Sequence, residues 1–144
     1  MKNKEELLNE NMPEQARLAL FIDDTKECLE DIVKERFFRK ETGQMLKDSF
    51  SNVANRMDSI RFQVNNANTD ALTARGLAGK ELSIKLRGYS LEKDQYIKNR
   101  KLENLIRMLH WSNIILSSLT FVSAVESLKS FQEVLLIEVE RANS

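Results

Sequence analysis

The sequence contains few of the residues that turns, disulfides and catalytic sites require. Its 144 residues include four glycines, one proline, one cysteine, one histidine and one tryptophan. With so little glycine and proline, the chain has few residues for the tight turns between short strands, which argues against a sheet-rich fold. The lone cysteine, Cys28, cannot form a disulfide within the chain, and this fits a reducing compartment. We therefore expect a helical protein of the cytoplasm.

A net charge is absent as well. The 22 basic residues balance the 22 acidic residues, so no overall field attracts the chain to nucleic acid or to an anionic membrane. The first residues are too polar for a signal peptide. We interpret residues 1–11 as a flexible N-terminal lead-in. Residues 12–144 are predicted to form a single helical-bundle domain, which is long enough to bury a core without disulfides or metals.

Catalytic and metal-binding motifs lack the residues they need. Bundle di-iron sites use Glu-x-x-His, whereas Arg107 stands three residues before the single histidine, His110. Cys28 has no second cysteine at zinc spacing, and no phosphate-binding glycine loop is present. We interpret His110 as a neutral core residue and Cys28 as a small buried hydrophobe. The chain is predicted not to be an enzyme and to have no catalytic, cofactor-binding or metal-binding residues.

Apolar residues recur at steps of three, four and seven, which is the period of an amphipathic helix. A first helix is expected to start after Pro13 and to end near Thr42 and Gly43. A second is expected to run at least to Val64, with a break near Asn66 and a new helix that Thr69 or Asp70 caps. The alternative is one bent helix from Gln44 to about Arg75. Most aromatic and methionine residues share the helical spacing and are predicted to be core residues: Phe21, Phe37, Phe38, Phe50, Phe62, Trp111, Phe121, Met45, Met57 and Met108.

The most apolar stretch, residues 102–142, contains neither glycine nor proline. Leucines and serines at steps of three and four predict one helix over the whole stretch, roughly 60 Å long at ~1.5 Å per residue. Its centre, residues 108–125, carries no formal charge while His110 is neutral. Serines and an asparagine within that run favour a buried core helix over a membrane span. The fold we expect is all-α: an antiparallel bundle of four or five helices with a long apolar C-terminal helix.

Such a C-terminal helix would be longer than its neighbours can cover. Helices of twenty to thirty residues cover only ~30–45 Å of it, which leaves apolar surface at its end. The residues concerned keep coiled-coil spacing: Leu128, Phe131, Leu135 and Val139. Exposed apolar patches mark interfaces, and two-fold symmetry is the commonest way to bury one, so we predict a homodimer through these residues. The alternatives are that the first helix folds over this end or that another protein occupies it.

Charge is sorted along the chain although it sums to zero. Residues 75–101 hold eight basic and three acidic residues. Part of this segment, Arg-Gly-Leu-Ala-Gly-Lys-Glu-Leu-Ser-Ile-Lys-Leu-Arg-Gly-Tyr-Ser over residues 75–90, resembles a helix-turn-helix of the repressor type with Gly88 in the turn. The resemblance implies a second helix that starts after Ser90 and presents Lys93, Gln95 and Asn99 to a major groove. The candidate nucleic-acid contacts are Lys80, Lys85, Arg87 and Lys93.

The same segment allows other interpretations. Residues 80–86 alternate apolar and charged side chains, a pattern that a short strand also shows. We prefer a short helix that ends at Gly88, followed by a helix that Ser90 caps and that continues toward the C-terminal one. In that arrangement the basic side chains can face the acidic first helix within the bundle rather than a nucleic acid.

The leading functional hypothesis is a non-enzymatic helical binding or assembly protein. It would act through protein–protein contacts, as an adaptor, a chaperone, an immunity protein or a phage accessory factor does, and its partner protein is not identified by the sequence. The alternative is a small helix-turn-helix-like DNA-binding regulator that uses residues 75–100, with the long helix for dimerisation. Association with a membrane through residues 109–125 is the least favoured of the three.

Overall fold

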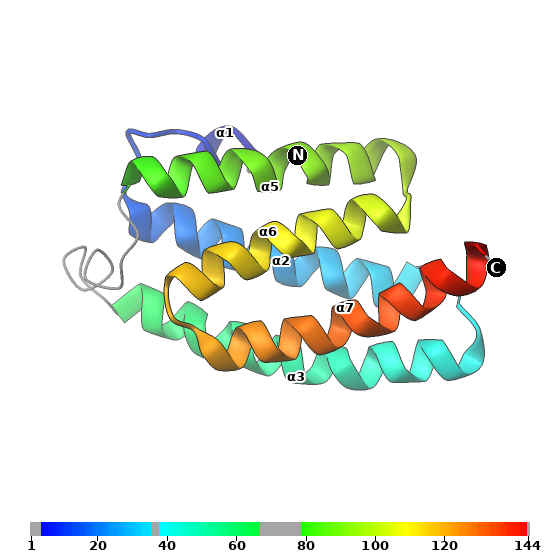
Figure 1. Ribbon diagram of the computed structural model, residues 1–144. Coiled ribbons are helices and arrows are strands. Elements are labelled where there is room, and N and C mark those ends of the chain that lie inside the picture. The colour runs from blue at the N-terminus through cyan, green and yellow to red at the C-terminus, as the bar shows by residue number, and fades with distance from the viewer. Residues whose placement is uncertain (1–3, 36–37, 67–78, 144) are drawn as a thin grey trace.

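The computed structural model describes residues 4–35, 38–66 and 79–143. Over these residues the chain forms helices and no strand, so the predicted all-α antiparallel bundle is confirmed (Figure 1). The helices are α1 (Lys4–Leu7), α2 (Glu14–Glu35), α3 (Lys40–Asn66), α5 (Gly79–Asn99), α6 (Leu102–Ser118) and α7 (Val122–Asn143).

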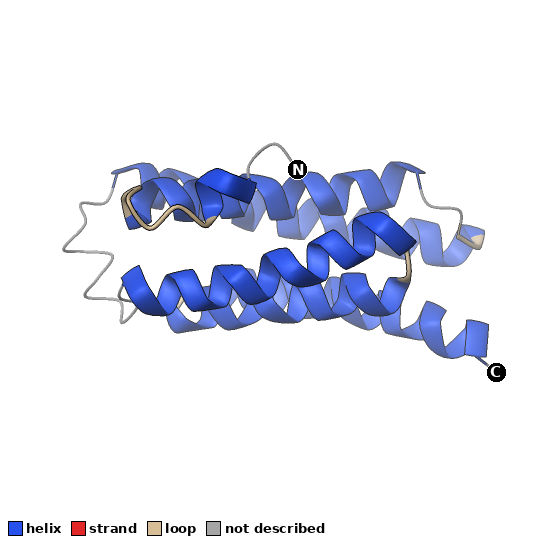
Figure 2. Ribbon diagram, turned by 90° about the horizontal axis from the view of Figure 1, so that it is seen from above, coloured by secondary structure: helices blue, strands red, loops and turns tan. Residues whose placement is uncertain are grey.

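The five longer helices form two layers, which are seen from two directions in Figures 1 and 2. Helices α2 and α3 lie side by side in one layer, and α5, α6 and α7 follow one another across the second layer. Contacts of α3 with α7 and of α2 with α5 join the layers at their edges. The short α1, within the predicted lead-in, contacts α2 and α5, and its Leu7 is fully buried.

The end of α2 and the start of α3 differ from the prediction, whereas the start of α2 and the end of α3 agree with it. Helix α2 starts directly after Pro13 as expected, but it ends at Glu35, well before Thr42. The N–H of Gly43 donates to the carbonyl of Arg39 at 2.8 Å, which places Gly43 in the first turn of α3. Glycine is tolerated inside a helix at a cost of about 1 kcal/mol, so it does not by itself end one. The predicted break near Asn66 is confirmed, because α3 ends there.

The prediction of one helix over residues 102–142 is wrong, because the chain turns at residues 119–121. The N–H of Phe121 donates to the carbonyl of Leu116 at 3.0 Å, and that of Thr120 donates to the carbonyl of Ser117 at 3.0 Å. This pair of bonds is the Schellman motif that closes many helices. Thr120 holds the left-handed position, with φ 61°, that glycine usually occupies there. Buried Phe121 and Leu116 supply the apolar pair that accompanies the motif.

Thr120→Gly is expected to raise the free energy of unfolding by about 1 kcal/mol, since a β-branched residue at positive φ is strained and glycine is not. Urea denaturation followed by circular dichroism measures the change. Thr120→Val keeps the β-branch and loses the hydroxyl, so this variant should not be stabilised. An equal gain from both substitutions would mean that strain at residue 120 is not the cause.

Helix α5 runs without interruption from Gly79 to Asn99, so neither the predicted end at Gly88 nor the cap at Ser90 exists. The described part of the helix-turn-helix segment, from residue 79 onward, is one continuous helix and contains no turn; residues 75–78 lie outside the described residues, as do the candidate caps at 69 and 70. The strand alternative for residues 80–86 is also wrong. Gly88 serves close packing instead: a β-carbon on it would lie 2.5 Å from Cε2 of Trp111 on α6.

The predicted dimer patch forms part of the core. Leu128, Phe131 and Leu135 have no exposed surface, and Val139 is half-buried. The premise of an uncovered helix end fails because the turn at Thr120 shortens the last helix to 22 residues and α3, with 27 residues, packs along it. Replacing Leu135 by a charged residue would therefore disturb folding and would not test whether two copies associate.

Three further side chains differ from their predicted burial. His110 is exposed, because Leu109 and Ser112 beside it face the core and the helical period turns His110 away. Phe62 and Met45 on α3 are also exposed. Among the helices that the structure describes, none combines the length and the apolarity needed to span a membrane.

Candidate functional site

A buried polar cluster joins α2 to α5 between the two layers. The ammonium of Lys93 is paired with the carboxylate of Asp24, and both side chains are about nine-tenths buried. The hydroxyl of Tyr89 donates to the other oxygen of Asp24 at 2.8 Å and accepts from Thr25 at 3.3 Å. The ring of Tyr89 meets Phe21 edge-on, with centroids 5.1 Å apart. Long side chains thus fill the space between α2 and α5 and satisfy one another's polar groups.

A second buried contact joins the same two helices near their N-terminal ends. The guanidinium of Arg17 donates to the hydroxyl of Ser83 at 2.5 Å and to the carbonyl of Gly79 at 3.4 Å. Arg17 is almost fully buried. Together with the Asp24–Lys93 pair, this contact fixes how α5 lies along α2.

The cluster includes the thiol of Cys28, which lies 4.0 Å from the sulfur of Met108 on α6. Burial raises the pKa of Cys28 from 9.0 to about 11, against the opposing effect of the Lys93 charge. Burial, followed by the Asp24 carboxylate, also raises the pKa of Tyr89 well above 10.0. Both groups are therefore protonated at neutral pH, and the thiol is a poor nucleophile. The cluster therefore links α2 to α5, and the raised pKa values of Cys28 and Tyr89 do not suit acid–base chemistry at neutral pH.

These pKa shifts predict a loss of stability in alkali. The pKa of the Cys28 thiol is 9.0 in the unfolded chain and about 11 in the folded protein. The protonated thiol therefore contributes its full stabilisation below pH 9, and this contribution is lost between pH 9 and pH 11. We expect the free energy of unfolding, measured by urea denaturation, to fall across that range. Cys28→Ala should show a shallower fall, with the remainder due to Tyr89. An unchanged slope in Cys28→Ala would contradict the assignment.

The four candidate nucleic-acid contacts do not lie together. Lys93 is 8% exposed and paired with Asp24, so it is not available at the surface. Lys80 and Arg87 are exposed and Lys85 is half-buried on the same helix. Arg87 lies 4.0 Å from Glu10. The interpretation that basic side chains of this segment face acidic groups within the bundle is confirmed for Lys93.

An open groove of about 760 Å³ lies at the end of the bundle where α5 turns into α6. Its lining combines one apolar side chain with amides and charged groups: Leu91, Glu92, Gln95, Asn99, Lys101, Glu103, Asn104 and Arg107. Arg100, with φ 54°, makes the turn, and the Oδ1 of Asn99 accepts from the N–H of Lys101 at 2.9 Å.

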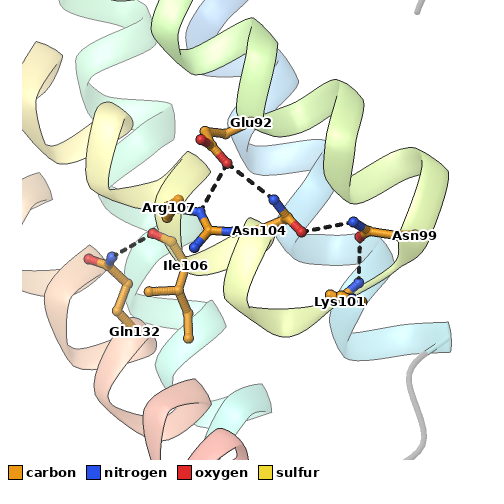
Figure 3. Close-up of polar contacts among 7 residues, drawn as sticks. All are labelled: Glu92, Asn99, Lys101, Asn104, Ile106, Arg107 and Gln132. Carbon is orange, nitrogen blue, oxygen red and sulfur yellow. Dashed lines mark hydrogen bonds and ion pairs between the residues drawn. The ribbon is translucent and has the colours of Figure 1, made fainter.

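A chain of hydrogen bonds holds the polar wall of this groove (Figure 3). One oxygen of Glu92 accepts from Asn104 and from Nε of Arg107, both at 3.2 Å. Asn104 in turn accepts from Asn99 at 2.9 Å. The side chain of Arg107 is 59% exposed, so its outer N–H groups face solvent. On the far side of α6, Gln132 donates to the carbonyl of Ile106 at 3.4 Å and ties α7 to this helix.

Apolar side chains continue the groove along the outer side of α5 and α6. Ile84 and Leu91 are 55% and 61% exposed, and they lie four residues before and three residues after Gly88 on the same side of α5. Trp111 packs against Gly88 and so lies between them, half-buried. Ile114, one turn further along α6, is half-buried too. We call Ile84, Leu91, Trp111 and Ile114 the α5–α6 strip.

Sequence reasoning missed this surface, although a signal for it exists. Leu82, Leu86, Tyr89, Lys93 and Tyr96 keep steps of four and three, which marks them as the buried side of α5. Ile84 and Leu91 fall outside that stripe and are therefore exposed. The same stripe contains Lys93, which identifies it as a core residue.

No family model, curated protein or solved structure matches this chain. In the described part of the chain, no group of three or more His, Cys, Asp and Glu side chains is placed to hold a metal ion. The functional proposal therefore rests on the chain's own surface.

Proposed function

We propose that this chain is a non-enzymatic helical binding protein that acts through protein–protein contacts at the α5–α6 strip. The observation that supports the proposal is the strip itself: two large aliphatic side chains more than half exposed, on either side of the half-buried Trp111 and beside the exposed Arg107. Aromatic and arginine side chains are enriched at protein interfaces, and exposed apolar patches mark such interfaces. We further propose that the protein acts in the cytoplasm, where the thiol of Cys28 stays reduced.

Site-specific photo-cross-linking in the cells that produce the protein tests this proposal. A photoreactive phenylalanine derivative at Leu91 is expected to form a covalent adduct with a protein partner. The matched control places the same group at Phe62, which is 69% exposed on α3 in the other layer. If no adduct forms at either position, the protein-binding function is contradicted. An adduct at Phe62 alone would show that the binding surface lies on α3.

The DNA-binding alternative is supported by the basic side chains that α5 leaves at the surface, Lys80, Lys85 and Arg87. Phosphate contacts make such binding weaken steeply with salt. A mobility-shift assay with mixed duplex fragments at low salt tests it, and changing these three residues to Glu is expected to abolish any binding. Affinity that survives those changes would exclude α5 as the DNA contact.

A further inference from the structure

The α5–α6 strip and the groove together have the length that a partner helix requires. Helices α5 and α6 are antiparallel (Figure 1), and the contact of Gly88 with Trp111 lets them approach closely. From Ile84 to the groove at Asn99 the surface extends over roughly 22 Å, at ~1.5 Å per residue of α5. A helix of about fifteen residues spans that length, and its apolar side chains at steps of three, four and seven can contact the strip.

The charge around the strip indicates the sign of the partner. Residues 79–118 hold eight basic and four acidic residues, a net charge of +4. Lys93 is neutralised inside the bundle by Asp24, which leaves a net +3 for the rest of the segment. At the groove, Lys101 and Arg107 are balanced by Glu92 and Glu103. The basic excess lies on α5, where Lys80 and Arg87 are exposed one turn before and one turn after Ile84. Electrostatic complementarity therefore favours an acidic partner.

Two other occupants fit less well. A second copy of this chain, paired through the same surface by two-fold symmetry, would place like charges opposite each other, which is unfavourable. A nucleic acid could place its phosphates against the basic side chains, but its charged backbone would then lie against the apolar side chains of Ile84, Leu91 and Trp111. An amphipathic helix of another protein satisfies both the apolar and the basic groups.

We propose that the α5–α6 strip binds an acidic amphipathic helix of a partner protein. Its apolar side chains contact Ile84, Leu91 and Trp111, and its carboxylates contact Lys80 and Arg87 beside Ile84. This inference rests on the proposed protein-binding function and adds the secondary structure and the charge of the partner.

A displayed library of sixteen-residue amphipathic helices, whose polar positions vary among Glu, Lys and Gln, provides the probe. Selection against the whole chain is expected to enrich Glu at those positions. Trp111 is the only tryptophan of the chain, so its fluorescence reports binding of the selected peptides directly. Leu91→Asp is expected to weaken binding about tenfold or more, the loss typical of an interface hot spot. Lys80→Glu is expected to weaken it about fivefold and to reduce its salt dependence.

Two matched variants change an exposed apolar side chain elsewhere: Phe62→Asp on α3 and Val122→Asp on α7. Both should bind the selected peptides as the unaltered protein does, and circular dichroism verifies that every variant is folded. Failure to enrich any helix, enrichment of Lys over Glu, or affinity that survives Leu91→Asp would overturn the inference. Cross-linking of a partner at Phe62 together with a failed selection would leave the protein-binding function standing and remove only the helix-binding strip.

Discussion

Replacing Lys93 by Met is expected to lower the free energy of unfolding by about 3–5 kcal/mol, because a buried charge that loses its partner cannot recover its hydration. Asp24 is 7% exposed, and with Lys93 gone only the hydroxyl of Tyr89 still donates to its carboxylate among the contacts described. Folded domains are stable by about 5–15 kcal/mol in all, so this loss would leave the variant marginal. Urea denaturation followed by circular dichroism measures it.

The double variant Asp24→Asn/Lys93→Met separates the charge from the packing. The amide oxygen that Asp24→Asn introduces would still accept from Tyr89, and no unpaired charge remains, so much of the stability lost in Lys93→Met should return. Lys26→Met provides the surface control: Lys26 pairs with Asp58 at 2.6 Å in a partly exposed position, and its loss should cost less than about 1 kcal/mol. Equal losses from the Lys26 and Lys93 substitutions would refute the importance of burial.

Gly88→Ala is expected to destabilise the protein by about 1–3 kcal/mol, the usual cost of overpacking a close contact. The new methyl carbon would lie 2.5, 2.6 and 2.9 Å from three atoms of the Trp111 indole, a rigid ring that cannot bend away. Without this contact the substitution would instead stabilise a helix by about 1 kcal/mol. The sign of the effect therefore tests the proximity of α5 to α6.

Gly43→Ala is the matched control, since no atom lies within 4 Å of a β-carbon at this position in the first turn of α3. It should raise the free energy of unfolding by about 0.5–1 kcal/mol. Replacing Trp111 by Leu removes the indole, so Gly88→Ala in that background should no longer destabilise. A gain from Gly88→Ala in the unaltered protein would show that Trp111 does not pack on Gly88.

The periodicity of apolar residues was sufficient to predict the class of fold and several helix boundaries. Helix stripes depend only on local spacing, and the break near Asn66 follows from side chains that compete for backbone hydrogen bonds. The turn at Thr120 could not be predicted in this way. Its left-handed residue is a threonine rather than a glycine, and tertiary packing of Phe121 stabilises it.

Gly88 and Lys93 were difficult to predict for another reason, because each residue type occurs in two different structural settings. Glycine permits both a turn and a close helix contact, and only the position of Trp111 decides between them. Lysine is almost always exposed, so residue type alone assigns Lys93 to the surface, whereas its place on the stripe of Leu82, Leu86 and Tyr89 assigns it to the core. The α5–α6 strip depends on which side of α5 is covered, and that requires the arrangement of the helices in space.

Each layer of the bundle is built from one continuous stretch of chain, residues 14–66 for α2 and α3 and residues 79–143 for α5, α6 and α7. Helices that follow one another meet after closing short loops, and proteins dominated by such local contacts fold within microseconds to milliseconds. We expect the two stretches to form their own helix pairs early and to dock onto each other late. The Asp24–Lys93 pair forms only at docking, so its loss should mainly accelerate unfolding and leave the folding rate nearly unchanged.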